Sequence, residues 1–366
     1  MTEQEYMRRA IELAWKGAGW TSPNPLVGAV VVKDGRIIGE GYHAKYGEFH
    51  AERNALNACS EDPAGATLYV TLEPCCHTGK TPPCTDIIIE KKIARVVIGS
   101  RDPNPKVAGR GAAILREAGI DVVEDFLREE CDELNPVFFQ YITTGIPYVV
   151  MKYAMTLDGK IATWTGASRW VTEEEARRQV HRMRGRYAAI MAGIGTVLAD
   201  DPMLNCRLEG AHQPVRVILD SRLRIPMDCK ICQTAREYRT IIVCCEDLAD
   251  ESRIRKLEVL GATVWKLPKK GKGVDLAELM RRLGREKIDS VLIEGGGTIN
   301  ESALKQGIVN HVCAYIAPKI FGGKDAKTPV EGHGIEWPDQ AAVLHNRKIS
   351  TIGDDVLLEY DVKGGR

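Results

Sequence analysis

The sequence lacks the long apolar segments and the charge imbalance that mark several classes of protein. Its first residues, MTEQEYMRRAIELAWKG, contain no apolar core of a secretory signal, and no apolar run approaches the 18 residues of a membrane span. The 50 lysines and arginines balance 50 aspartates and glutamates, so the basic excess typical of non-specific nucleic-acid binders is absent. We therefore expect a cytoplasmic protein that binds neither membrane nor nucleic acid, although a local anion pocket is compatible with zero net charge.

Aromatic residues are few, at 6%, whereas cysteine is plentiful, with eleven residues. An odd number of cysteines fits poorly with a complete set of disulfides. In the reducing compartment expected here, most of these cysteines should be buried thiols or metal ligands.

The length of 366 residues suggests two domains, and the order of expected elements places both in the α/β class. Tyr6, Ala10, Leu13 and Ala14 recur at helical spacing near the N-terminus. LVGAVVV and IIGEGY read as strands joined by a tight Asp-Gly turn, and ATLYVTLEP and ARVVIGSRDP read as later strands between helices.

A break in this alternation appears where TTGIP precedes a new strand, YVVMKYA. Glycine and proline punctuate the chain there, so we predict one domain over residues 1–146 and a second over 147–366. In the second domain YAAIMAG, VRVILDS, TIIVCC, SVLIEGGG and VCAYIAP are expected strands. The basic segment KLPKKGKG (266–273) is interpreted as a solvated turn.

TLEPCCHTGKTPPC, residues 71–84, combines three cysteines and a histidine, and FHAERNAL lies upstream of it. A catalytic zinc site takes three protein ligands and keeps one position for water. His50 should open one helix, Cys75 should follow a strand, and Cys84 should open another helix after two prolines. We predict that these three residues bind one zinc ion, although Cys76 and His77 are alternative ligands and a closed structural site with His77 is a further reading.

Glu52 lies two residues after His50, in the H-x-E pattern of zinc deaminases, where the glutamate transfers protons and is not a ligand. Here the second cysteine follows the first after eight intervening residues, in place of the two in C-x-x-C. The predicted chemistry is hydrolytic deamination, with Glu52 as the acid/base residue.

Two glycine-rich turns follow apolar strands in the second half, AAIMAGIGTVLADD and SVLIEGGGTINESAL. Glycine lets a backbone approach a phosphate, and the N-terminus of the following helix favours negative charge. Neither turn matches the full dinucleotide fingerprint, so the residues alone favour nucleotide or phosphate binding only in general terms.

The motifs SPNPLVGAVVV, HAE, TLEPCCHTGKTPPC and RDPNPKVAGRG, taken together, resemble the deaminase half of the bifunctional riboflavin biosynthesis family of the RibD type. KYAMTLDGKIAT, GASRWVT, GIGTVLADDPMLNCR, VILDS and LIEGGGTINESAL resemble its reductase half. The resemblance implies a cytidine-deaminase-like three-layer α/β/α domain followed by a dihydrofolate-reductase-like α/β domain. It also implies deamination of a phosphorylated diaminopyrimidinone and subsequent reduction of its ribosyl side chain by NADPH.

The resemblance also implies site residues in the second domain. The matched cofactor contacts are Ala154, Trp170, Thr196, Asp200, Ser221, Gly296, Gly297, Thr298, Ile299, Asn300, Glu301 and Ser302. The matched substrate contacts are Ser168, Arg184, Leu204, Arg207 and Glu294. The guanidinium groups of Arg184 and Arg207 would suit the substrate's phosphate.

Several roles rest on weaker arguments. Asp200 and Lys152 are the ionisable candidates for proton delivery during reduction, and we favour Asp200. In the first domain, substrate contacts are expected from Asn24, His43, His77 and Lys80.

Two other readings of the whole chain stay open. The chain could be a nucleoside or tRNA deaminase fused to a nucleotide-binding module, or a non-catalytic zinc module. The zero net charge and the eight-residue metal loop disfavour the first, and Glu52 disfavours the second. The family resemblance further predicts a homo-oligomer, either a dimer or a tetramer.

Overall fold

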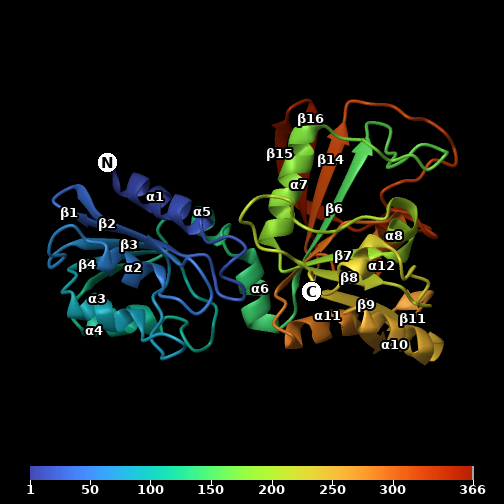
Figure 1. Ribbon diagram of the computed structural model, residues 1–366. Coiled ribbons are helices and arrows are strands. Elements are labelled where there is room, and N and C mark those ends of the chain that lie inside the picture. The colour runs from blue at the N-terminus through green and yellow to red at the C-terminus, as the bar shows by residue number, and fades with distance from the viewer. Residues whose placement is uncertain (365–366) are drawn as a thin grey trace. The chain divides into compact units, whose positions relative to one another are not determined.

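The structure, a computed structural model, describes residues 1–364 and divides into two compact units, Met1–Gly145 and Ile146–Arg366. Figure 1 shows helices and strands in both units. No helix in the described part of the chain is both long enough and apolar enough to cross a bilayer.

The first unit is built on a five-stranded sheet in the order β2-β1-β3-β4-β5. β1 pairs antiparallel with β2 and β3, whereas β3, β4 and β5 run parallel. The strands are β1 (Gly28–Lys33), β2 (Arg36–Tyr42), β3 (Thr67–Leu72), β4 (Arg95–Ser100) and β5 (Asp121–Val123). The turn between β1 and β2 has positive φ at both Asp34 and Gly35, as the Asp-Gly pair predicts.

Helices cover both faces of this sheet because successive side chains of each strand point to opposite sides. One face packs against α1 (Glu3–Trp15) and α5 (Arg128–Asp132), through a core that includes Met7, Val30 and Cys131. The other face packs against α2 (Ala51–Asn57), α3 (Cys84–Glu90), α4 (Arg110–Glu117) and α6 (Pro136–Thr144). The predicted three-layer α/β/α domain is thus confirmed.

The second unit contains a nine-stranded mixed sheet in the order β10-β9-β8-β7-β13-β6-β14-β16-β15. Its first seven strands are parallel, and β16 and β15 close the edge in antiparallel pairs. The strands are β6 (Tyr148–Thr156), β7 (Ala189–Gly193), β8 (Val215–Leu219), β9 (Thr240–Cys245), β10 (Thr263–Leu267), β13 (Ser290–Ile293), β14 (His311–Ala317), β15 (Leu344–Ile352) and β16 (Asp355–Val362). A small separate hairpin joins β11 (Lys269–Lys270) to β12 (Gly273–Val274).

This sheet also has two apolar faces. α11 (Leu276–Arg285) and α12 (Gly297–Lys305) pack on one face, while α8 (Ile194–Asp200), α9 (Lys230–Gln233) and α10 (Glu251–Val259) pack on the other. α7 (Glu174–Arg186) precedes β7 and contributes Met183, whose sulfur accepts a hydrogen bond from the hydroxyl of Tyr315. The strands expected from the five apolar segments of this half are confirmed, but the sequence analysis did not identify the β15–β16 hairpin.

Candidate functional site

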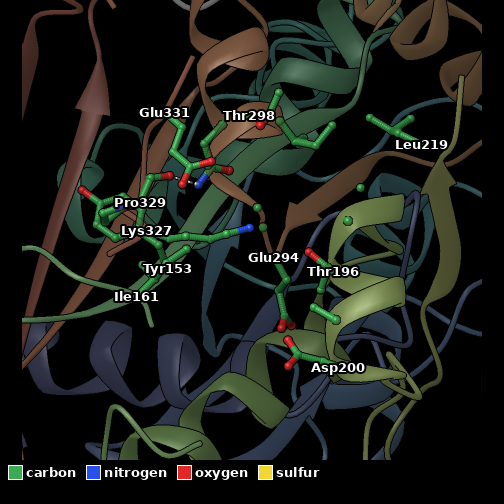
Figure 2. A pocket seen from close by; sticks show the side chains of 18 of the residues that line it. Tyr153, Ile161, Thr196, Asp200, Leu219, Glu294, Thr298, Lys327, Pro329 and Glu331 are labelled. Carbon is green, nitrogen blue, oxygen red and sulfur yellow. Dashed lines mark hydrogen bonds between the residues drawn. The ribbon is translucent and has the colours of Figure 1, made fainter. Parts of the chain in front are cut away.

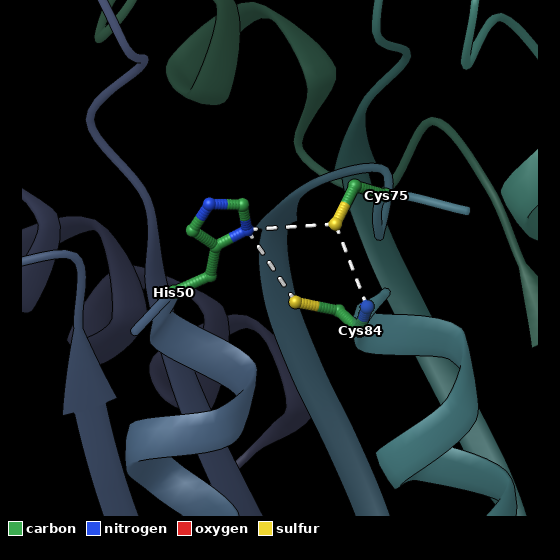
Figure 3. A group of neighbouring side chains, drawn as sticks. All are labelled: His50, Cys75 and Cys84. Carbon is green, nitrogen blue, oxygen red and sulfur yellow. Dashed lines mark hydrogen bonds between the residues drawn. The ribbon is translucent and has the colours of Figure 1, made fainter. Parts of the chain in front are cut away.

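The first candidate site gathers His50, Cys75 and Cys84, which are far apart in the sequence (Figure 3). His50 is the N-cap residue of α2, and Cys84 is the first residue of α3. Cys75 lies beyond the end of β3, in a segment whose position depends on the buried carboxylate of Glu73. That carboxylate accepts hydrogen bonds from the backbone N–H groups of Gly109, Gly111 and Ala112 at the start of α4.

The distances between the three side chains suit a tetrahedral zinc ion. The Nδ1 atom of His50 lies 3.5 Å from the sulfur of Cys75 and 3.5 Å from that of Cys84. Zn–S and Zn–N bonds of about 2.3 and 2.05 Å at tetrahedral angles place nitrogen and sulfur about 3.6 Å apart. The three donors therefore fit zinc with little movement, and three protein ligands leave the fourth position for water.

The electrostatics of this group also suit a cation. Hydrogen bonds from Cys84 and His50 lower the pKa of Cys75, whereas the same contact with Cys75, together with burial, raises the pKa of Cys84, so the pair favours one thiolate beside one thiol. The backbone N–H of Cys84 also points to the Cys75 sulfur, at 3.4 Å. Cys76 directs its thiol elsewhere, to the carbonyl of Lys106 at 3.7 Å, and neither it nor His77 belongs to the metal-binding group found among residues 1–364.

Glu52 is buried in the first turn of α2, two residues from His50. Burial, together with the nearby negative charge of Cys75, raises the pKa of Glu52 to about 7. A carboxyl group with a pKa near neutrality can both accept and release a proton at physiological pH.

The residues proposed to contact substrate in this unit are Asn24, His43, His77 and Lys80, of which His77 is partly buried. The Asn24 amide nitrogen is 3.2 Å from Nε2 of His43, and the His43 ring stands edge-on to that of His50, with centroids 5.1 Å apart. Burial lowers the pKa of His43 to about 4, so it is neutral at pH 7. The ammonium group of Lys80 lies 4.0 Å from the centre of the Tyr46 ring.

The second candidate site is a cavity of about 670 Å³ in the second unit, bordered by the ends of several parallel strands and the helices that follow them. Figure 2 shows Thr196, Asp200 and Glu294 on one side and Lys327, Pro329 and Glu331 on another. Binding sites in parallel α/β sheets commonly occupy this position.

Most of the predicted contacts in this half line the cavity. The cofactor set is represented by Ala154, Trp170, Thr196, Asp200, Ser221, Gly296, Gly297, Thr298, Ile299, Asn300 and Ser302, and the substrate set by Ser168, Arg184, Arg207 and Glu294. Glu301 and Leu204 do not line it. Glu301 pairs with Lys305 one turn along α12, and Leu204 is buried in the apolar core beneath α8.

The turn before α12 needs its glycines. Gly295 has a φ of +113°, a conformation that other residues rarely adopt. A Cβ atom on Gly297 would lie 2.7 Å from the carbonyl oxygen of Thr328. The first glycine therefore permits the turn, the third permits its close packing against Thr328, and all three glycines line the cavity.

Arg184 and Glu294 form a bidentate ion pair inside the cavity, with N–O distances of 2.6 and 2.7 Å. The third guanidinium nitrogen of Arg184, Nη1, donates a hydrogen bond to the backbone carbonyl of Asn205 at 3.1 Å. Although burial opposes the charged form, Arg184 lowers the pKa of Glu294, so the pair is ionised. The guanidinium fork of Arg184 is thus occupied by Glu294, whereas Arg207 is exposed and contacts Nε2 of His181 through Nε, at 3.1 Å.

Sequence reasoning missed most of the positive charge around this cavity. Eight basic and three acidic side chains line it; the basic ones are Lys152, Arg177, Arg184, Arg207, Arg224, Lys270, Lys272 and Lys327, and the acidic ones Asp200, Glu294 and Glu331. Lys270 and Lys272 belong to the segment interpreted as a solvated turn. They are exposed as expected, but they also line the cavity, a position that their local sequence does not indicate.

Comparison with known proteins shows what each half of the chain is similar to. Residues 1–100 match the cytidine and deoxycytidylate deaminase zinc-binding region, and residues 147–358 match the RibD C-terminal domain. A riboflavin biosynthesis protein RibD from Actinobacillus pleuropneumoniae is 58% identical over 362 residues, which cover 99% of this chain and 96% of the relative.

The chain belongs to the RibD family. The Escherichia coli (strain K12) RibD is 39% identical, over 98% of this chain and 99% of the relative. A solved structure from Thermotoga maritima, described as a deaminase and a 5-amino-6-(5-phosphoribosylamino)uracil reductase, is 40% identical with a TM-score of 0.83 and covers 98% of both chains. An Acinetobacter baumannii RibD structure is 36% identical with a TM-score of 0.85, again over 98% of both chains.

Family membership makes this chain a bifunctional riboflavin biosynthesis enzyme, with a zinc-binding deaminase domain and a reductase domain. The fold class expected from the resemblance is confirmed in both domains.

Proposed function

We propose that residues 1–146 deaminate 2,5-diamino-6-ribosylamino-4(3H)-pyrimidinone 5′-phosphate in a zinc-dependent hydrolysis. Residues 147–366 would then reduce the ribosyl side chain with NADPH, giving 5-amino-6-ribitylamino-uracil 5′-phosphate. The observation that carries this proposal is the convergence of His50, Cys75 and Cys84 beside the buried carboxyl group of Glu52.

In the deaminase reaction, His50, Cys75 and Cys84 would hold one zinc ion per chain, which supplies Lewis acidity that lowers the pKa of water toward roughly 7. Glu52 would take one proton from the attacking water and deliver it to the ring nitrogen, and would then carry the second water proton to the amino group as its carbon–nitrogen bond breaks and ammonia leaves. Its burial keeps the proton exchange inside the site, because bulk water does not reach the carboxyl group. Asn24, His43, His77 and Lys80 are proposed to orient the pyrimidine and its phosphate.

In the reductase reaction, the cavity of the second unit would hold both NADPH and the deaminated substrate. The basic side chains around it suit ligands that carry several phosphates. Thr196 and the residues at the start of α12 are proposed to bind the cofactor, with Ser168 and Arg207 on the substrate. The occupied fork of Arg184 supports a positioning role through Glu294 in place of direct phosphate binding.

Reduction also needs an acid that protonates the oxygen of the ribose carbonyl. Asp200 lines the cavity, and its carboxylate accepts a hydrogen bond from Ser168 at 3.2 Å. Lys152 lines it as well, and burial lowers the pKa of its ammonium group, which makes that proton easier to release. We retain Asp200 as the proposed proton donor, with Lys152 as the residue that must be tested beside it.

A coupled assay with the phosphorylated diaminopyrimidine tests the proposal. Without NADPH we expect release of ammonia and accumulation of the ribosyl product. With NADPH we expect ammonia release together with NADPH oxidation and formation of the ribityl product. Failure to release ammonia from this substrate by the zinc-loaded chain would overturn the proposed function.

We also propose that the chain forms a homo-oligomer, a dimer or a tetramer, as the family resemblance predicts. Light scattering of the full chain during size-exclusion chromatography gives the mass of the particle in solution. A mass equal to that of one chain, 40.4 kDa, would contradict this part of the proposal.

A further inference from the structure

A second group of potential metal ligands lies in the reductase unit, on the neighbouring strands β14 and β16. His311 stands directly opposite Asp361 in the antiparallel register, and Cys313 stands directly opposite Glu359. These four residues share one face of the sheet, because Val312 between them points into the apolar core of the other face. None of the four lines the large cavity.

Three of these side chains converge closely enough to bind one ion. The Nε2 atom of His311 lies 3.7 Å from Oε1 of Glu359, and the sulfur of Cys313 lies 3.8 Å from the same oxygen. Ligand atoms of a tetrahedral zinc ion would lie about 3.4 Å apart for nitrogen and oxygen, and about 3.6 Å for sulfur and oxygen. The two distances to Glu359 exceed these values by a few tenths of an ångström, and the three donor atoms all lie within 4.8 Å of one another.

The fourth residue supports the histidine in the way found around many metal sites. The carboxylate of Asp361 lies 2.8 Å from Nδ1 of His311, so it fits the tautomer that carries its proton on Nδ1. That tautomer directs the lone pair of Nε2 toward Glu359 and Cys313. Asp361 is itself held by the amide of Asn346, at 2.9 Å, and such outer carboxylates are typical partners of metal-bound histidines.

We propose that His311, Cys313 and Glu359 form a second divalent metal site, with Asp361 as the residue that orients His311. A nitrogen, a thiolate sulfur and a carboxylate oxygen are the donor types of zinc sites, so zinc is the ion expected. The cysteine is buried, with 3% exposure, whereas the side chains of His311 and Glu359 are partly exposed and give an ion and a water molecule access from solvent.

The surrounding charge is compatible with a bound dication. A thiolate and two carboxylates would bring three negative charges, while Lys348, opposite Glu359 on β15, and Arg186, whose charge acts on Cys313, each bring one positive charge. In the opposing interpretation the same residues form only an ion-pair network around His311, and no metal binds.

Zinc analysis of the full-length chain separates the two interpretations. The purified protein is stripped with a chelator, dialysed against zinc at sub-micromolar free concentration, and analysed by mass spectrometry of the elements. We expect two zinc ions per wild-type chain and one in a Cys75→Ser/Cys84→Ser variant. We also expect one zinc ion per chain in Cys313→Ser. Cys59→Ser is the matched control, because it changes a half-buried thiol that belongs to neither donor set, and it should keep two zinc ions. One zinc ion per wild-type chain, or no loss in Cys313→Ser, would overturn the proposal.

Cobalt provides a readout that does not depend on counting. In the Cys75→Ser/Cys84→Ser background, Co²⁺ bound at the second site should show thiolate-to-cobalt charge-transfer absorption in the near ultraviolet. Cys313→Ser should abolish that absorption, and Glu359→Gln, which keeps the shape of the side chain, should weaken cobalt binding at least tenfold. Circular dichroism and thermal unfolding show whether each variant is folded. Absence of the charge-transfer band in the folded background variant would refute the site.

Discussion

Glu52→Gln is the substitution that most directly tests the deaminase chemistry. Glutamine keeps the size and shape of the buried side chain but cannot take a proton from water. The carboxyl group is enclosed in the first turn of α2, two residues from His50, so no other acidic side chain of that turn replaces it. The variant should therefore keep its zinc ligands and lose proton transfer.

The expected loss follows from the usual contribution of a positioned acid/base, about 10²–10⁴-fold in rate. At 1.36 kcal/mol for each factor of ten, this corresponds to about 3–5 kcal/mol of activation free energy. The loss should appear in kcat for ammonia release. Zinc content should stay at the wild-type value, because Glu52 is not a proposed ligand.

The bifunctional chain carries its own control for this experiment. Reduction of separately prepared deaminated substrate by NADPH should proceed at the wild-type rate in Glu52→Gln, since the reductase cavity lies in the other unit. Glu48→Gln, at an exposed position of the same segment, is the matched substitution and should leave ammonia release unchanged. Ammonia release by zinc-loaded Glu52→Gln within a few-fold of wild type would refute the role assigned to Glu52.

Three further predictions concern the reductase unit. Glu294→Gln should lower the free energy of unfolding by about 3–5 kcal/mol in urea titrations, because it leaves the Arg184 charge buried without its partner. Glu278→Gln, which removes a partly exposed ion pair with Arg281, should have a much smaller effect, and equal effects would contradict this reasoning. Burial, with the charge of Arg184, lowers the pKa of His181 to about 4 in the folded chain, whereas a histidine in the unfolded chain has an ordinary pKa near 6.5. As the pH falls, the unfolded chain therefore takes up the proton first, which favours unfolding. His181 should thus reduce stability by roughly 2 kcal/mol between pH 6.5 and 4, and urea titrations of His181→Gln should lack that part of the pH dependence. Lys272→Gln should raise the KM for NADPH about fivefold, equivalent to about 1 kcal/mol, with little change in kcat. The KM of the variant should also depend less on salt concentration than that of the wild type. An unchanged KM would show that Lys272 does not bind the cofactor.

The candidate zinc ligands could be proposed from the sequence because each one stands next to a local signal. His50 and Cys84 mark helix starts, and Cys75 follows an apolar strand, so their elements could be assigned from patterns a few residues long. The residue pattern HAE then predicted Glu52 as the acid/base residue. What the pattern could not provide was the burial of Glu52 and its raised pKa, since these depend on the helices and strands that pack around it.

The reductase cavity was less accessible to such reasoning. Its glycine-rich turn before α12 was evident, but the positions of Lys270 and Lys272 at the cavity depend on a short hairpin that joins segments without a strong pattern. The β15–β16 hairpin was missed because most residues of β15 are exposed and show no alternation of buried and exposed positions.

Local sequence was thus sufficient for the α/β fold class, for most strands of the two sheets and for proposing His50, Cys75 and Cys84 as one group, because each depends on spacing along the chain or on neighbouring residues. Which side chains pair with one another required the folded chain. Arg184 was expected to bind phosphate, yet it lies against Glu294, 110 residues away, and His311 meets Asp361 across two strands. Such partners are chosen by the register of the sheet and the packing of helices on it, and nothing within a short stretch of sequence specifies them.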